Sequence, residues 1–259
     1  MTRTYAVTGA ASGIGKATAE LLKAQGHRVI GIDIKDADIV ADLSKAEGRQ
    51  AMADAVAKAA DGKLDAVVAV AGLATPTADT VSVNYFGMTA TLDMLRPLLA
   101  GSDAPRAVGV ASMASLMPVD DELVELQLAG DEEAARARAE VLAADAQTGG
   151  LIYSSTKVAF CRWVRRNAAT PEWAGASIPL NAIAPGVIVT PMVEPLLATE
   201  EGRAQIAQGV PMPLNGFAPP EAPARLLMWL ASEENTHLCG QVVFIDGGSD
   251  VVYRGDSTW

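Results

Sequence analysis

The chain has 259 residues, half of them apolar, with a formal net charge of −11 and two cysteines. This length suits one large α/β domain, and the acidic charge argues against a nucleic-acid partner because phosphate binding needs a basic face. An apolar strand follows Thr4 directly and apolar stretches stay short, so we expect no signal peptide and no membrane association, and the widely spaced thiols favour the reducing cytoplasm.

Short β-type runs alternate with longer helical patterns along the chain. Helices are predicted over residues 13–25 and after residue 44, where Ser44 and Glu47 have the spacing of a capping box. The alternation predicts a doubly wound α/β fold, in which one domain over residues 1–259 contains a parallel seven-stranded sheet with helices on both faces. The predicted strands are residues 4–8, 28–33, 39–43, 64–70, 106–111, 176–184 and 241–245.

A glycine-rich turn joins the first strand to the first helix. Glycine lets the chain turn tightly and lets backbone N–H groups approach a pyrophosphate. Gly13 and Gly15 begin a helix whose N-terminal dipole favours that anion. The turn predicts a dinucleotide site, with an ordinary strand-to-helix turn as the alternative. Its sequence is Thr8-Gly9-Ala10-Ala11-Ser12-Gly13-Ile14-Gly15.

Two acidic residues follow the next strands. Asp33 ends the second strand, where a carboxylate accepts hydrogen bonds from the adenosine ribose and repels a 2′-phosphate, which favours NAD(H) over NADP(H). Lys35 is close enough to offset that charge in part, but we interpret it as a surface lysine. Asp42 and Leu43 are expected beside the adenine ring, and a plain strand end is the alternative for them.

Residues 116–148 interrupt the strand–helix rhythm. The stretch from 120 to 147 is rich in alanine, leucine, acids and arginine, and it predicts two helices broken at Gly130. Asp131, Glu132 and Glu133 place acids at the positive end of the second helix dipole. A solvated acidic hairpin is the simpler interpretation, and shaping an oligomer interface is the functional one.

A tyrosine and a lysine stand four residues apart, at Tyr153 and Lys157, which puts both on one face of a helix. A nearby cation favours the phenolate, so the pKa of Tyr153 is expected to fall from about 10 and the phenol to exchange protons. Ser112 follows an apolar strand, at the sheet edge where ligands bind. Asn84 lies early in a helix. Each residue alone also has a structural explanation.

Together these motifs resemble the short-chain dehydrogenase/reductase family over essentially the whole chain. The resemblance implies a Rossmann fold and a nicotinamide cofactor. The motifs, in the family's order, are the glycine turn, Asp33, Asn84, Ser112, Tyr153-x-x-x-Lys157, Pro185-Gly186 with Thr190, and Asp246-Gly247-Gly248.

The resemblance also assigns catalytic roles. Tyr153 is the general acid/base on the substrate oxygen, Lys157 lowers its pKa and binds the nicotinamide ribose, and Ser112 donates a hydrogen bond to the same oxygen. Asn84 holds a water that links Lys157 to solvent. No metal site is expected. The implied NAD(H)-binding set is Gly9, Ser12, Gly13, Ile14, Gly15, Asp33, Asp42, Leu43, Ala71, Gly72, Tyr153, Lys157, Pro185, Gly186, Val189 and Thr190.

Two departures narrow the resemblance. Ala69-Val70-Ala71-Gly72 replaces the family's Asn-Asn-Ala-Gly, so the adenine-side packing must differ, and residues 116–148 exceed the usual spacing. The chain looks like the bacterial 3α-hydroxysteroid dehydrogenase/carbonyl reductase subgroup, and coniferyl-alcohol dehydrogenase-like enzymes resemble it too. That subgroup implies a homodimer, with the family's homotetramer as the alternative.

Residues 187–220 are expected to form a substrate lid. They are apolar and rich in methionine, which suits a deformable cover over an apolar substrate, although about half of them should simply pack the lid onto the domain. Arg203 is the one cation there, so a neutral substrate is favoured. Further pocket candidates are Leu73, Met113, Leu116 and Met117. The lid candidates are Met192, Val193, Leu196, Leu197, Ile206, Val210, Met212, Leu214 and Phe217.

The sequence therefore predicts an NAD(H)-dependent oxidoreductase that interconverts a hydrophobic secondary alcohol and its ketone, on a hydroxysteroid or an aryl-alkyl carbonyl compound. A dehydrogenase of benzylic or cinnamyl alcohols is the alternative. A dinucleotide-sensing protein without activity is disfavoured, because the chain keeps Asn84, Ser112, Tyr153 and Lys157.

Overall fold

A parallel seven-stranded sheet forms the centre of the computed structural model, which describes residues 2–258. Its strand order is β3-β2-β1-β4-β5-β6-β7, and every neighbouring pair is parallel. This confirms the doubly wound architecture. The strands are β1 (Thr4–Thr8), β2 (Arg28–Asp33), β3 (Ile39–Val40), β4 (Ala66–Ala69), β5 (Arg106–Val110), β6 (Leu180–Pro185) and β7 (Val242–Ile245).

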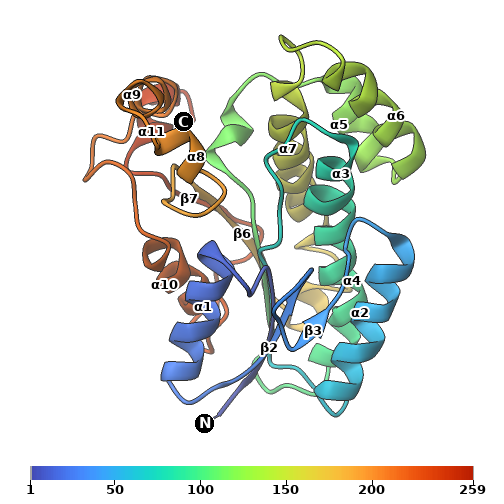
Figure 1. Cartoon of the computed structure of the whole chain (residues 1–259). Helices are drawn as coiled ribbons and strands as arrows, with labels where there is room; N and C mark the ends of the chain where they lie inside the picture. The colour runs from blue at the N-terminus through green and yellow to red at the C-terminus, as the bar shows by residue number, and fades with distance from the viewer. Residues whose placement is uncertain (1, 259) are drawn as a thin grey trace.

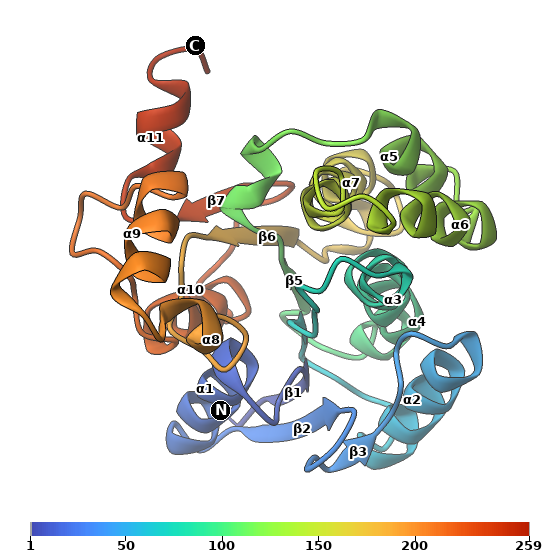
Figure 2. The same ribbon diagram turned by 45° about the horizontal axis from the view of Figure 1, so that its top comes forward.

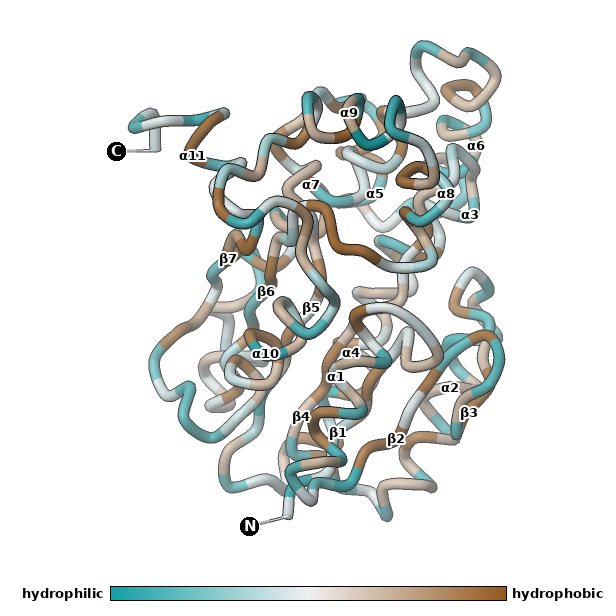
Figure 3. Tube along the Cα trace, turned by 60° about the vertical axis from the view of Figure 1, so that its left-hand side comes forward, coloured by the Kyte–Doolittle hydropathy of each residue, from teal (hydrophilic) through white to brown (hydrophobic). Residues whose placement is uncertain are grey.

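Helices cover both faces of the sheet (Figure 1). On one face lie α1 (Gly13–Ala24) and α10 (Glu221–Leu230), and on the other lie α2 (Ala46–Ala59), α4 (Met88–Leu99) and α7 (Gly150–Asn167). Because both faces are covered, β4 and β5 are buried along their whole length and contain continuous apolar runs. Hydrophobic colour follows the central strands in Figure 3.

Successive strand residues alternate between two cores. Val67 packs with the α2, α4 and α7 side, whereas Val68 packs with the α1 and α10 side, as the two-residue period of a strand requires. The position of a residue along its strand therefore decides which of the two cores its side chain joins. This alternation explains why a run such as Ala66–Ala69 contains no polar position.

The order in which strands are added to the sheet reverses at β1 and β4. β2 and β3 lie on one side of β1, and β4 lies on its other side. The loops that leave the carboxyl ends of β1 and β4 therefore run in opposite directions and leave a crevice between them. Thr8 ties the two strand ends, since its Oγ1 accepts hydrogen bonds from the N–H groups of Val70 (2.9 Å) and Ala71 (3.1 Å). The crevice at this point is where a doubly wound fold binds its ligand.

The inserted helices form as predicted. Residues Asp121–Leu128 make α5 and Glu132–Ala143 make α6, with Gly130 in the left-handed region (φ +79°) between them. Asp120 and Asp131 cap the two helices and accept from the N–H groups of Leu123 (2.8 Å) and Ala134 (3.0 Å). Figure 2 shows the pair beside α7.

Shorter elements surround the carboxyl ends of the strands (Figure 2). Ala78–Val81 (α3) continues through a π-helical segment, Ser82–Gly87, into α4, so Asn84 lies in π-helical geometry. The others are the 3₁₀ helices Met113–Leu116 and Ala174–Ala176, and α8 (Glu194–Leu197), α9 (Glu200–Gly209) and α11 (Ser249–Arg254).

Two local predictions were wrong. The third strand, expected over 39–43, ends at Val40, because Asp42 Oδ1 accepts from both the N–H (2.9 Å) and the hydroxyl (2.6 Å) of Ser44 and turns the chain there. For the same reason Ser44 does not open a capping box, and Lys45 is the residue that precedes α2.

Other boundaries moved by a few residues. The fourth, fifth and seventh strands are shorter than expected, and the sixth begins at Leu180 because residues 174–177 form a 3₁₀ turn with Ser177 in the left-handed region (φ +60°). Met1 and Trp259 of the expected domain lie outside the described residues. Between residues 2 and 258, no helix combines the length and apolarity that crossing a membrane requires.

Candidate active site

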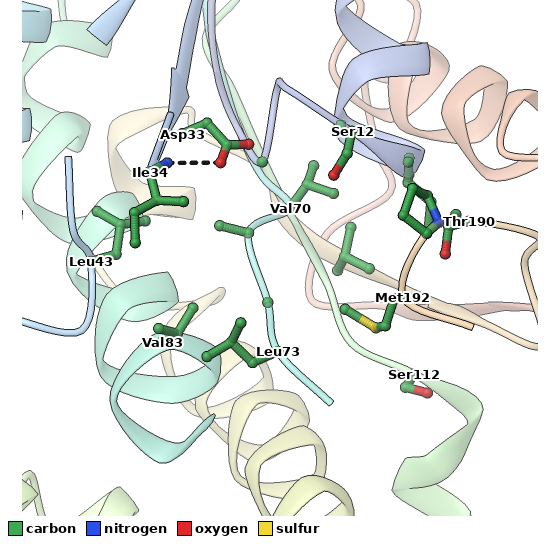
Figure 4. Close-up of a pocket in the computed structure, with 18 of the residues that line it drawn as sticks. Ser12, Asp33, Ile34, Leu43, Val70, Leu73, Val83, Ser112, Thr190 and Met192 are labelled. Atoms are coloured by element: carbon green, nitrogen blue, oxygen red, sulfur yellow. Dashed lines mark hydrogen bonds between the residues drawn. The ribbon is translucent and has the colours of Figure 1, made fainter. Parts of the chain in front are cut away.

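A pocket of about 530 Å³ lies above the carboxyl ends of the central strands. Its lining joins segments from the whole chain, and it collects most of the predicted site. Figure 4 shows Asp33 and Ser112 at opposite ends of it, with Thr190 and Met192 along one side. The predicted residues that line it are Gly9, Ser12, Gly13, Ile14, Gly15, Asp33, Asp42, Leu43, Ala71, Gly72, Ser112, Tyr153, Lys157, Pro185, Gly186 and Thr190.

The glycine turn forms a close-fitting cradle. A Cβ on Gly15 would lie 2.2 Å from the carbonyl oxygen of Gly9, and Gly13 has a φ of +52° that side chains rarely adopt. Ser12 precedes α1, and within the described chain its side chain makes no cap hydrogen bond to the helix. Figure 4 shows that side chain at the pocket. The first N–H groups of α1 and the Ser12 hydroxyl therefore fit a pyrophosphate.

Gly15→Ala is expected to destabilise the protein by about 1 kcal/mol net and to weaken dinucleotide binding. Alanine gains about 1 kcal/mol of helix propensity over glycine, but the contact falls on rigid backbone, and overpacking of this kind costs about 1–3 kcal/mol. Gly150→Ala is the matched control, since a Cβ there would meet nothing within 4 Å among the described atoms. Urea denaturation and an NADH titration would check this, and equal stability of the two variants would contradict it.

At the other end of the cradle, the backbone orients Asp33. Its Oδ2 accepts from the N–H of Ala11 (3.0 Å) and its Oδ1 from the N–H of Ile34 (2.7 Å), the bond drawn in Figure 4. Each carboxylate oxygen keeps a further lone pair, so the group can also accept from a ribose diol. Ile34 and Leu43 lie beside it with apolar side chains that suit a flat ring.

Asp42 lines the pocket, but its carboxylate serves the local turn. The hydrogen bond from the Ser44 hydroxyl is the main reason that the pKa of Asp42 lies below its ordinary value. The expected contact of this carboxylate with an adenine ring stays a prediction.

Three of the four predicted catalytic residues line the pocket. Ser112 lies two residues after β5 and caps the following 3₁₀ helix, with its Oγ accepting from the N–H of Ala114 (3.1 Å). Tyr153 and Lys157 lie one turn apart on α7. Lys157 is buried, and its Nζ donates to the carbonyl oxygen of Val110 (3.0 Å) at 5.5 Å from the centre of the Tyr153 ring.

The expected lowering of the pKa of Tyr153 is not found in this structure. Burial raises the pKa of the phenol above its ordinary value, and the neighbouring Ser112 hydroxyl opposes this only in part. The ammonium of Lys157 lies over the ring and donates to the carbonyl oxygen of Val110, and no hydrogen bond from it to the phenol oxygen is found among residues 2–258. Burial also lowers the pKa of Lys157 to about 8, while Cys161 one turn later acts in the opposite direction.

The burial of Lys157 should make stability depend on pH. The folded protein releases the lysine proton near pH 8 and the unfolded chain near 10.5, so unfolding takes up a proton between these values and rising pH stabilises the fold. Relative to Lys157→Met, the unfolding free energy of the wild type should rise by about 1 kcal/mol per pH unit near pH 9. Denaturant melts at pH 8, 9 and 10 would check this. Parallel stability curves for the two proteins would refute it.

Neither Asn84 nor Val189 is among the lining residues found within residues 2–258. Asn84 is fully buried, and its Oδ1 accepts from the N–H of Leu73 (2.7 Å) while its Nδ2 donates to the carbonyl of Leu73 (2.8 Å) and to Thr156 Oγ1 (3.4 Å). Its side chain thus joins the loop after β4 to the catalytic helix. The expected water on Asn84 stays a prediction.

Val189 is half exposed, and its N–H donates to the carbonyl oxygen of Ala218 (2.9 Å), while Ile188 takes the pocket position. A backbone contact of Val189 with a carboxamide also stays a prediction.

Part of segment 187–220 enters the pocket. Met192 and Val193 line it together with Pro191, whereas Met212 packs against Gly186, where a Cβ would lie 2.9 Å from its sulfur. Leu196 and Leu214 are exposed. Leu73 lines the pocket, but the other wall candidates, Met113, Leu116 and Met117, are not among its described lining residues.

Some lining residues escaped the sequence reasoning. Ile34 and Val70 each come directly after a strand and Ile188 comes soon after one, a position that could have identified them, because ligands bind at the carboxyl ends of parallel strands. Val83 and Asp79 reach the pocket from the helix after β4, and no sequence signal indicates them.

Comparison with known proteins identifies relatives of this chain. Residues 3–124 match the family model described as short chain dehydrogenase, and residues 132–250 match the one described as enoyl-(acyl carrier protein) reductase. The chain is 42% identical over 253 residues to the 3-alpha-hydroxysteroid dehydrogenase/carbonyl reductase of Comamonas testosteroni, covering 96% of each protein. It is 31% identical to the cis-4-hydroxycyclohexanecarboxylate dehydrogenase of Sinomonas cyclohexanicum, covering 96% of this chain and 97% of the relative.

A solved structure agrees with the sequence comparison. The 3-alpha-hydroxysteroid dehydrogenase from Pseudomonas sp. B-0831, complexed with NADH, superposes with a TM-score of 0.88 at 38% identity and covers 98% of this chain and 99% of that one. These findings confirm the predicted fold and enzyme class and support the predicted nicotinamide cofactor. The family-model matches, the 42% identity and the matching fold show that the chain belongs to the short-chain dehydrogenase/reductase family of oxidoreductases.

Proposed function

We propose that this protein is an NAD(H)-dependent oxidoreductase that interconverts a hydrophobic secondary alcohol and its ketone. The supporting observation is a single pocket lined by Ser112, Tyr153 and Lys157 together with Asp33. Ser112 and Asp33 lie at its opposite ends in Figure 4. The glycine cradle fits the pyrophosphate between them, and the carboxylate of Asp33 favours a ribose without a 2′-phosphate. A bound NAD(H) would supply or accept the hydride.

The residues around the substrate oxygen divide the remaining work. Ser112 donates a hydrogen bond to the oxygen, where negative charge develops during reduction. Tyr153 transfers the proton, and because burial keeps its pKa high the phenol is neutral at physiological pH and ready to act as the acid. Lys157 holds the nicotinamide ribose. Asn84 keeps the loop at Leu73 against the catalytic helix.

The substrate is proposed to be neutral and to contain a cyclic secondary alcohol or ketone, with aryl-alkyl carbonyl compounds also accepted. The names of both relatives denote an alcohol on a saturated six-membered ring. Among the described lining residues the cations are Lys35, beside Asp33, and Lys157. Lys157 donates to the carbonyl of Val110, and Arg203 donates to the carbonyl of Leu197 (2.7 Å) and is not among the described lining residues, so neither is proposed to bind a substrate carboxylate. Met192 and Val193 supply an apolar wall.

A substrate panel tests this function. Purified protein and NADH would be incubated with 3-ketosteroids, substituted cyclohexanones with and without a carboxylate, aryl ketones and cinnamaldehyde, and product chirality would be measured. We expect the neutral cyclic ketones to give the highest kcat/KM and one product stereoisomer. Preference for cinnamaldehyde would indicate an allylic or benzylic alcohol dehydrogenase instead, and NADH binding without any turnover would indicate a sensing role.

We also propose a cytoplasmic homodimer. The inserted helix α5 packs along α7, and an ion pair between Glu125 and Arg162 (3.1 Å) joins them, so this face of the catalytic helix is already covered within the chain. We therefore propose that a homotetramer built through that face is disfavoured. Cys161 and Cys239 are free thiols, which suits a reducing compartment.

Residues 187–220 are proposed to cover the substrate as a lid.

A further inference from the structure

The inserted hairpin contacts both elements that carry the catalytic end of the pocket. At its start, the N–H of Asp120 donates to Ser155 Oγ (2.9 Å), and the hydroxyl of Ser154 donates to the carbonyl of Pro118 (2.5 Å). Both serines lie between Tyr153 and Lys157 on α7. The hairpin therefore binds the catalytic helix at the residues between its two functional side chains.

A second connection comes from Arg136 on α6. Its Nη1 donates to Ser82 Oγ (2.6 Å) and to Asp79 Oδ1 (3.0 Å), and it lies 3.4 Å from the carbonyl oxygen of Ala78. Ser82 is completely buried, whereas the side chain of Asp79 is about half exposed and lines the pocket. Hydrogen bonds with an ionised donor are shorter and stronger than neutral ones, so this contact orients the buried hydroxyl.

Ser82 begins the π-helical segment that contains Asn84. π-Helical geometry is rare and occurs mainly as single turns within α-helices, often at functional sites. A return to α-helical register would rotate Asn84 around the helix axis and break its paired hydrogen bonds with Leu73. A hydrogen bond joins Arg136 to Ser82, and Asn84 follows Ser82 by two residues along the π-helical backbone. The amide of Asn84 then contacts Leu73 at the pocket wall and Thr156 on α7.

We propose that Arg136 is a positioning residue of the active site. It fixes the register of the π-helical segment, so that the inserted hairpin holds Asn84 and the loop at Leu73 in place against the catalytic helix. This inference rests on the proposed function, since it assigns to the hairpin a part in turnover.

Four variants test it: Arg136→Met, Arg136→Lys, Ser82→Ala, and the double variant Arg136→Met/Ser82→Ala. We expect Arg136→Met to lower kcat about tenfold, with the Kd of NADH changing less than about twofold. Arg136→Lys should recover part of kcat, and the double variant should be no worse than Arg136→Met. Amide hydrogen exchange over residues 82–87 should be faster by about tenfold in Arg136→Met, a readout that needs no turnover.

The matched control is Glu125→Gln, which breaks an exposed ion pair of the same hairpin that touches neither the π-helical segment nor the pocket. It should leave kcat and exchange unchanged. The inference is overturned if Arg136→Met keeps kcat within twofold of the wild type or if Glu125→Gln lowers kcat equally. It is also overturned if Arg136→Met changes the sedimentation coefficient, because the loss of kcat would then come from altered assembly or folding. Failure of the wild type to reduce any ketone would instead overturn the proposed function, and faster exchange in Arg136→Met would still establish the contact's role.

Discussion

Replacing Tyr153 with phenylalanine is expected to lower kcat for ketone reduction by about a thousandfold, since a positioned general acid contributes about 10²–10⁴ in rate. The hydroxyl is the only group of this residue that phenylalanine lacks, and the ring that lies under Lys157 remains in place. Binding of NADH depends on the glycine cradle and Asp33, so its Kd should change less than about twofold. Steady-state kinetics and a fluorescence titration would measure the two effects.

Tyr5→Phe gives the matched control for this prediction. Tyr5 is also buried, and its hydroxyl accepts from Arg3 Nε (3.2 Å) near the amino end of β1, away from the pocket. Its loss should cost about 1 kcal/mol of stability and leave kcat unchanged. If Tyr153→Phe kept kcat within tenfold of the wild type, the proton would have to come from another group, and the assignment of Tyr153 would be withdrawn.

Asp33→Asn is the second change with a large expected effect. Removing the carboxylate charge should shift the ratio of kcat/KM for NADPH over NADH by about a hundredfold toward NADPH, because juxtaposed like charges cost several kcal/mol. Lys35 lines the same end of the pocket and would then be free to attract the 2′-phosphate. The amide keeps one acceptor oxygen, so one of the two bonds to Ala11 and Ile34 is lost and NADH binding should also weaken.

Asp36→Asn separates the local effect from the change in net charge. Asp36 is exposed three residues later, in the left-handed region (φ +51°) that asparagine tolerates well. The same cofactor ratio measured for this variant should equal that of the wild type. An equal shift in both variants would mean that the general field of the protein, and not the contact of Asp33 with the ribose, decides the cofactor.

Much of this molecule could be predicted from short stretches of sequence. The alternation of strands and helices, the turn from Gly9 to Gly15, the acid at Asp33, and the two helices broken at Gly130 each depend on neighbours within a few residues. The spacing of Tyr153 and Lys157 is likewise local, because residues four positions apart on a helix lie on the same face. Boundaries were less predictable, as the hydrogen bonds from Ser44 to Asp42 show.

What the tertiary structure alone decided involves residues far apart in the chain. The family resemblance predicted Asn84 among the catalytic residues, but only the fold shows that its amide is bonded to Leu73 and Thr156. The pKa of Tyr153 depends on burial and on the position of the Lys157 ammonium, and neither can be inferred from the four-residue spacing of the pair. Local periodicity determines which element forms, whereas electrostatics and pocket shape depend on distances between elements, which exist only once the chain has folded.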